Sequence, residues 1–145
     1  MIVPDLNLLL YAQFRDVPQH QVALHWWQDA MDGREPVGIP WLVVVGFVRV
    51  ATHASAMTLP LSTSQAMGVV TDWLSVPHVN PLNPGSRHLS IMENLLDAAG
   101  VGGNLVNDAH IAALAIEFQA EVHSNDSDFA RFPGLRWRNP LQDPR

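Results

Sequence analysis

Residues 105–130 read LVNDAHIAALAIEFQAEVHSNDSDFA, a helical pattern followed by a strand pattern and an acidic loop. Apolar side chains recur at helical spacing through 105–119 and form one stripe: Ile111, Leu114, Ala115 and Phe118. A short apolar strand is predicted at 121–124, and a polar loop with two aspartates follows it at 125–130. This order of helix, strand and loop is typical of the repeating unit of an α/β protein.

The same alternation of strands and helices extends over the rest of the chain. Short apolar runs predict strands, and amphipathic runs bounded by capping residues or glycine predict helices. The strands are expected at 1–3, 37–39, 77–81, 121–124 and 135–137, and the helices at 6–14, 18–31, 41–52, 62–74, 87–99 and 105–119. The β-branched residues of 41–52 leave a strand there as the alternative.

This alternation predicts one α/β domain over residues 1–145. Strands linked by helices pair in parallel, so we expect a mainly parallel four- to five-stranded sheet flanked by helices. In such sheets the functional crevice lies beyond the carboxyl ends of the strands. Acidic residues that directly follow strands are therefore the first candidates for a functional site.

The composition excludes several classes of protein. With 48% hydrophobic and 15% charged residues, the chain is expected to form an ordered domain. No apolar run reaches the roughly 18 residues of a membrane span, and Asp5 interrupts any signal-peptide pattern, so a cytoplasmic protein is expected. The absence of cysteine excludes disulfides, thiolate zinc sites and a cysteine nucleophile.

The charge constrains any interaction with nucleic acid. The net charge is −6, and all eight basic residues are arginines. This balance argues against tight, non-specific binding to nucleic acid, but it is compatible with a nuclease whose excess negative charge is offset by a bound metal. Arginine also suits bidentate phosphate contacts better than lysine does.

Four aspartates are predicted to meet at the carboxyl edge of the sheet. Asp5 follows the first strand and Asp126 follows the fourth, so both project from one edge if these strands are parallel. Asp108, in the first turn of the 105–119 helix, can join them, and Asp128 lies two residues beyond Asp126. Carboxylates this close repel one another, and such a group persists when a cation offsets the repulsion.

The donor set indicates which cation and which chemistry to expect. Oxygen ligands, without cysteine or a histidine pair at zinc-like spacing, favour Mg²⁺ or Mn²⁺ over zinc. Phosphodiester hydrolysis needs such a site, because water must be activated and the charge on the departing oxygen neutralised. The alternative is that the acids only stabilise local structure, Asp5 and Asp108 at helix N-termini and Asp126 and Asp128 in a turn.

Three motifs in order along the chain carry a resemblance to a known family. They are residues 5–7 (DLN), 107–115 (NDAHIAALA) and 124–129 (SNDSDF). Together they closely resemble the PIN-domain ribonucleases of the VapC toxin family, and the ending at 129–141 looks like the actinobacterial branch of these toxins. The resemblance implies a Mg²⁺-dependent endoribonuclease that acts on tRNA, rRNA or mRNA, is neutralised by a cognate VapB antitoxin and usually forms a homodimer.

The resemblance also assigns roles to single residues. It implies that Asp5, Asp108 and Asp126 are the catalytic, metal-binding acids, with Asp128 as a supporting metal ligand. Two further positions match small polar residues of the family motifs and are expected to support the acids: Asn7 and Ser124.

One position departs from the family pattern. The family usually carries a glutamate in its third helix, just before a stretch like residues 47–49 (FVR), and this chain has Gly46 there. The departure bears on how many ions bind, and it favours the alternative of a catalytically degenerate PIN-like module that binds antitoxin or RNA without cleaving. A DNA-directed nuclease is a third possibility. Arg49, one turn from Gly46, is expected either to bind phosphate or to pair with a site carboxylate.

Other aromatic and basic residues have mainly structural interpretations. The tryptophans in helices are interpreted as core or dimer contacts rather than base-stacking platforms: Trp26, Trp27, Trp41 and Trp73. His110 is interpreted as structural. Three arginines interleave with Phe132 and Trp137 in residues 131–138, a pattern compatible with RNA contact, and a solvated tail is the alternative.

Overall fold

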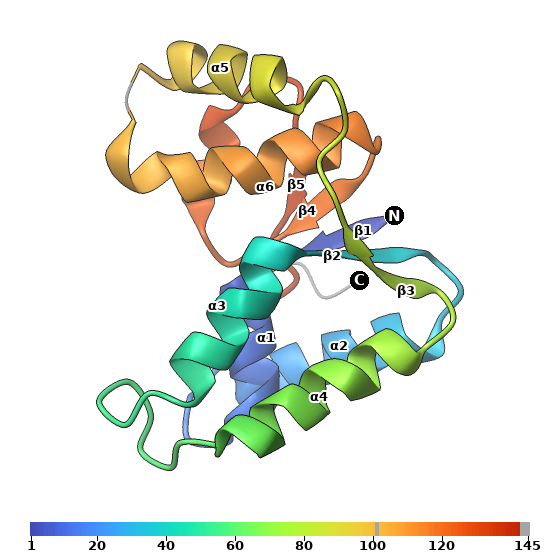
Figure 1. Ribbon diagram of the computed structural model, residues 1–145, viewed down its shortest axis with the longest axis vertical. Helices are drawn as coiled ribbons and strands as arrows, with labels where there is room; N and C mark the ends of the chain where they lie inside the picture. Colours follow the sequence, from blue (N-terminus) through green and yellow to red (C-terminus); the bar gives the residue numbers. More distant parts are fainter. Residues whose placement is uncertain (101, 143–145) are drawn as a thin grey trace.

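A parallel sheet forms the centre of the computed structural model, which describes residues 1–100 and 102–142 (Figure 1). The strands lie in the order β3-β2-β1-β4-β5, and every neighbouring pair is parallel. Their bounds are Ile2–Pro4 for β1, Val37–Pro40 for β2, Val79–Leu82 for β3, Glu121–His123 for β4 and Arg136–Arg138 for β5. The predicted parallel α/β sheet is therefore confirmed.

Helices cover the sheet in two groups, with α5 and α6 on one side and α1 to α4 on the other (Figure 1). The α-helices are α1 Leu6–Gln13, α2 His20–Asp32, α3 Trp41–Ala51, α4 Thr63–Ser75, α5 His88–Ala99 and α6 Val106–Glu117. Two 3₁₀ helices are η1 Gly103–Leu105 and η2 Ser127–Arg131. The acidic segment at 125–130, expected as an irregular loop, thus contains a short helix. Within the described residues, none of the helices is long and apolar enough to span a bilayer.

Helix α3 resolves the ambiguity left by its β-branched residues. Val43, Phe47 and Ala51 are at most 1% exposed, whereas Val45 is 62% exposed. Burial at every fourth residue is the helical pattern, and packing of this face overrides the preference of valine for strands. The strand alternative for 41–52 is therefore wrong.

The stripe predicted on α6 is buried except at one position. Ile111, Leu114 and Ala115 are at most 3% exposed, but Phe118 is 41% exposed. Phe118 follows the last residue of α6 as its C-cap, so it lies at the very end of the predicted stripe. The small residues Ala112 and Ala113, which lie between the stripe positions, are also fully buried.

The chain reverses its path across the sheet between β1 and β4. It moves outward from β1 to β2 and β3, then returns to place β4 on the other side of β1 and β5 beyond it. The register pairs Val3 with Val122 and Pro4 with His123. Asp5 and Ser124 therefore leave the sheet side by side, at a switch point where open α/β sheets form their crevice.

Candidate metal centre

Asp5 joins the end of β1 to the start of α1. Its backbone N–H donates to the carbonyl of His123 at 2.9 Å, and its Oδ1 accepts from the backbone N–H of Leu6 at 2.8 Å, capping α1. Its Oδ2 accepts from the hydroxyl of Ser124 at 2.6 Å. Burial raises the pKa of Asp5 above 3.8, the nearby charge of Asp126 raises it further, and the two hydrogen bonds oppose the rise.

Ser124 connects motifs from opposite ends of the chain. Its fully buried hydroxyl donates to Asp5 and accepts from the backbone N–H of Asp126 at 2.9 Å. It also accepts from the side-chain amide of Asn7 at 3.3 Å. The amide oxygen of Asn7 in turn accepts from the backbone N–H of Asn125 at 3.3 Å. The two supporting residues suggested by the sequence motifs, Asn7 and Ser124, thus contact each other, and Ser124 also contacts Asp5.

Asp108, Asp126 and Asp128 form a compact group of carboxylates. Each offers an oxygen, and these oxygens lie within 4.8 Å of one another. Asp126 caps η2, because its Oδ1 accepts from the backbone N–H of Asp128 at 2.9 Å. Asp128 also lies 4.0 Å from the guanidinium of Arg131. Asp108 lies in the first turn of α6, and Asp126 and Asp128 lie at the start of η2. Positions that are typical of helix capping therefore bring three acids together.

The electrostatics of this group are those of crowded anions. Partial burial, together with the smaller effects of the charges on Asp5, Asp126 and Asp128, raises the pKa of Asp108 to about 7. Three hard oxygen donors fit Mg²⁺ or Mn²⁺, which take carboxylate and water ligands. Asp5 is outside the three-acid group, but its charge raises the pKa of Asp108, so it interacts electrostatically with the group.

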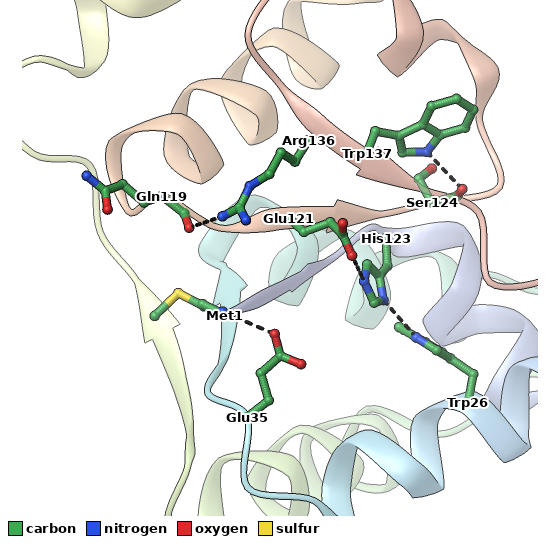
Figure 2. Close-up of polar contacts among 9 residues, drawn as sticks. All are labelled: Met1, Trp26, Glu35, Gln119, Glu121, His123, Ser124, Arg136 and Trp137. Carbon is green, nitrogen blue, oxygen red and sulfur yellow. Dashed lines mark hydrogen bonds and ion pairs between the residues drawn. The ribbon is translucent and has the colours of Figure 1, made fainter. Parts of the chain in front are cut away.

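Residues from β5 and the segment after it hold the turn that carries Asp126. The indole N–H of Trp137 donates to the carbonyl of Ser124 at 3.1 Å (Figure 2). The backbone N–H of Ser124 donates to the carbonyl of Arg138 at 3.1 Å. Beyond the strand, the amide of Asn139 donates to Asn125 Oδ1 at 3.0 Å. Asn125 and Asn139 lie within or beside the quoted motifs, but no local pattern predicts their contact, because only the tertiary fold brings them together.

These contacts favour a structural role for the aromatic residues of 131–138. Phe132 is 3% exposed, and the indole N–H of Trp137 is bound to the site turn. Arg136 donates to the carbonyl of Gln119 (Figure 2). Phe132 and Trp137 are therefore held by contacts within the fold, and RNA contact by the arginines of this segment stays a prediction.

A chain of hydrogen bonds links Trp26, His123 and Glu121 along β4 (Figure 2). The indole N–H of Trp26 donates to His123 Nδ1 at 2.9 Å, so this nitrogen carries no proton. His123 Nε2 then donates to Glu121 at 2.8 Å. Burial lowers the pKa of His123, in agreement with a neutral ring. A cavity of about 590 Å³ adjoins this chain, but none of the four aspartates lines it.

Three further residues named from the sequence are His110, Gly46 and Arg49. His110 Nδ1 lies 2.9 Å from His88 Nε2, which agrees with its structural interpretation. Gly46 is buried, and a Cβ added there would lie 3.0 Å from Cδ2 of Leu6, the residue after Asp5. Arg49 is exposed, and among the described residues no hydrogen bond or ion pair joins it to a carboxylate. Its pairing with a site acid is therefore not observed.

Comparison with protein families identifies what this chain is similar to. Residues 2–135 match the family described as "PIN domain". Ribonuclease VapC33 of Mycobacterium tuberculosis is 46% identical over 143 residues, which cover 99% of this chain and all of the relative. Ribonuclease VapC37 of the same species is 43% identical over 140 residues, which cover 97% of each chain.

Solved structures show the same fold at lower sequence identity. A chain of VapBC2 from Rickettsia felis, bound to a DNA fragment from its promoter, has a TM-score of 0.66 at 21% identity. A chain of VapBC-1 from nontypeable Haemophilus influenzae has a TM-score of 0.67 at 19% identity. Both alignments cover 96% of this chain and 98% of the other. At such identities the likeness concerns the fold alone.

Proposed function

This chain belongs to the PIN-domain family and, within it, to the VapC ribonucleases, and from this premise we propose that it is a Mg²⁺-dependent endoribonuclease toxin. The observation that carries the proposal is the group of Asp108, Asp126 and Asp128, whose oxygens lie within 4.8 Å of one another. The raised pKa of Asp108 supports it, because such crowding favours a bound cation. Repulsion among these carboxylates also disfavours a degenerate module, because a module without a bound cation would have nothing to offset it.

Some residues of the site would bind a cation, and others would orient the residues that bind it. Asp108, Asp126 and Asp128 would ligate it, and Asp5 would add charge from the end of β1 or complete the ligand set. A bound cation supplies activation of water and neutralisation of the departing oxygen. Ser124 keeps the carboxylate of Asp5 oriented through its hydroxyl, as hydrogen bonds to the acids of a metal site do.

Incubation of the full chain, freed of antitoxin, with total RNA tests the proposed activity. We expect new RNA ends in Mg²⁺ or Mn²⁺ and none in EDTA, and mapping these ends would show whether tRNA, rRNA or mRNA is cut. A DNA oligonucleotide of the cleaved sequence should remain intact. RNA that is bound but never cut in either metal would instead support the degenerate binding module.

Gly46→Glu should lower the metal concentration needed for half-maximal cleavage. A side chain at this position points at Leu6, beside Asp5, so a glutamate there would add a carboxylate near the site. The variant should fold, because replacing a helical glycine gains up to about 1 kcal/mol and the end of the Leu6 side chain has only to shift by a few tenths of an ångström.

Gly46→Gln is the matched control, with the same shape and no charge. A metal titration of cleavage should separate the two variants by roughly tenfold, the scale on which outer metal-site residues act. An equal metal requirement in both variants would show that position 46 is not a vacated ligand position.

We propose a VapB-type antitoxin as the partner that silences this site. The acidic crevice is a natural receptor for a basic side chain, so an arginine or lysine of the antitoxin is expected against Asp5, Asp108 and Asp126. Antitoxin affinity should then fall as Mn²⁺ is added, and fall at least tenfold in Asp126→Asn, since losing one partner of a buried charge pair costs about 2 kcal/mol or more. Affinity indifferent to both changes, measured by calorimetry, would refute this mode of inhibition.

The assembly and the place of action follow from the same proposal. Family membership supports a homodimer, which light scattering would detect as twice the 16.0 kDa of one chain. Because the proposed substrates are cellular RNAs, we place the activity in the cytoplasm.

A further inference from the structure

Trp41 differs from the other tryptophans of the helices in its exposure. Trp26, Trp27 and Trp73 are 6–8% exposed and pack against one another or against nearby rings. Trp41 is 45% exposed. Burial in the core therefore accounts for the other three tryptophans and not for Trp41.

Trp41 lies at the same edge of the sheet as Asp5 and Asp126. It directly follows Pro40, the last residue of β2. Strands β1 and β2 are parallel neighbours with Ile2 level with Val37, and Asp5 and Trp41 each directly follow the carboxyl end of one of them. Neighbouring strands are about 4.8 Å apart. Helices α1 and α3 thus begin beside each other, and they stay in contact where Gly46 faces Leu6.

The exposed face of α3 combines an aromatic ring with a cation. Trp41, Val45 and Arg49 follow one another at intervals of four residues, so they share one face, and all three are exposed. Trp41 and Arg49 are separated by eight residues, or about 12 Å along the helix. Among the described residues, no acidic side chain pairs with the guanidinium of Arg49, so it is available to a phosphate.

The charge of the protein explains why a stacking contact is needed. The chain carries a net charge of −6, and its candidate site is a cluster of carboxylates. Attraction to phosphates, the main source of affinity in most nucleic-acid binders, is therefore weak here. Stacking of a base on an aromatic ring is independent of net charge and tolerant of sequence.

We propose that Trp41 is a stacking platform for a nucleobase next to the scissile phosphate, and that Arg49 contacts a phosphate of the same single-stranded segment. The inference rests on the proposed ribonuclease function and adds to it the subsite that holds the substrate. It assigns to α3 a role in binding RNA that is separate from the carboxylates.

Binding of uncleaved RNA tests this subsite without relying on catalysis. The probe is a fluorescein-labelled single-stranded RNA that spans a mapped cleavage site or, if no RNA is cut, a mixed-sequence RNA. Its affinity for the Asp126→Asn protein is measured by anisotropy in Mg²⁺. Adding Trp41→Ala should raise Kd about tenfold or more, whereas Trp41→Phe should keep most of the affinity. Adding Arg49→Gln should reduce the dependence of Kd on salt.

Val45→Ala is the control on the same helix face, since it removes apolar area without removing a ring. Affinity unchanged by Trp41→Ala would overturn the inference. An equal loss in Val45→Ala, accompanied by a lower mass in light scattering, would overturn it in favour of a contact with a second copy of the chain. Tight RNA binding that depends on Trp41, in a wild-type protein that cuts no RNA, would support the subsite and refute the proposed function.

Discussion

Asp126→Asn should abolish metal-dependent RNA cleavage and leave the fold intact. The substitution removes one charge from the three-acid group while keeping an oxygen that can accept from the backbone N–H of Asp128 and cap η2. Charge stabilisation by a metal is worth several kcal/mol in a transition state, and each 1.36 kcal/mol is tenfold in rate. We therefore expect a loss on the order of a thousandfold in cleavage of a labelled RNA.

The same loss is expected for Asp108→Asn and for Asp5→Asn. In Asp5→Asn the amide oxygen of the new side chain can still accept from the hydroxyl of Ser124, so the turn should persist. Asp72→Asn is the matched control, because Asp72 is an exposed acid of α4. Full cleavage by the three site variants, with circular dichroism spectra like that of the wild type, would refute the assignment of the acids.

Metal-free protein should lose stability as the pH rises from about 4 to above 7, and divalent metal should reverse the loss. The pKa of Asp108 is about 7 in the folded chain against a usual value of 3.8. The folded state therefore binds this proton more tightly than the unfolded state does. The resulting stabilisation is complete below the unfolded pKa and disappears as the pH rises through the folded pKa. Asp5, whose pKa is also raised, acts in the same direction.

Melting curves with and without Mn²⁺ test this linkage. At a metal concentration a hundred times Kd, binding contributes about 2.7 kcal/mol, which corresponds to roughly 5–10 °C for a domain of this size. The rise should be larger at pH 8 than at pH 5, because at the lower pH the metal has to displace the proton of Asp108. Asp108→Asn should flatten the pH dependence and blunt the metal effect. A wild-type melting temperature indifferent to millimolar Mn²⁺ would contradict a metal site.

Local patterns in the sequence were sufficient for the elements and for the edge of the sheet that carries the site. Ser62 begins α4 with a capping box, and Gly100 ends α5 in the left-handed conformation at φ 74°, as capping residues predict. The placement of Asp5 and Asp126 directly after parallel strands followed from the alternation of strands and helices. Such features depend on backbone interactions within a few residues, so the local sequence is enough to predict them.

Only the tertiary structure determined which acids share one point and which aromatic side chain is left exposed. The sequence motifs group Asp5, Asp108 and Asp126, with Asp128 in support, but the fold buries Asp5 against Ser124 and brings oxygens of the other three within 4.8 Å of one another. Likewise, Trp41 and Trp73 have the same apolar character, and one is 45% exposed while the other is 7% exposed. Burial, desolvation and long-range hydrogen bonds depend on the packing of segments more than a hundred residues apart, as for Asn7 and Ser124, and no local pattern encodes that packing.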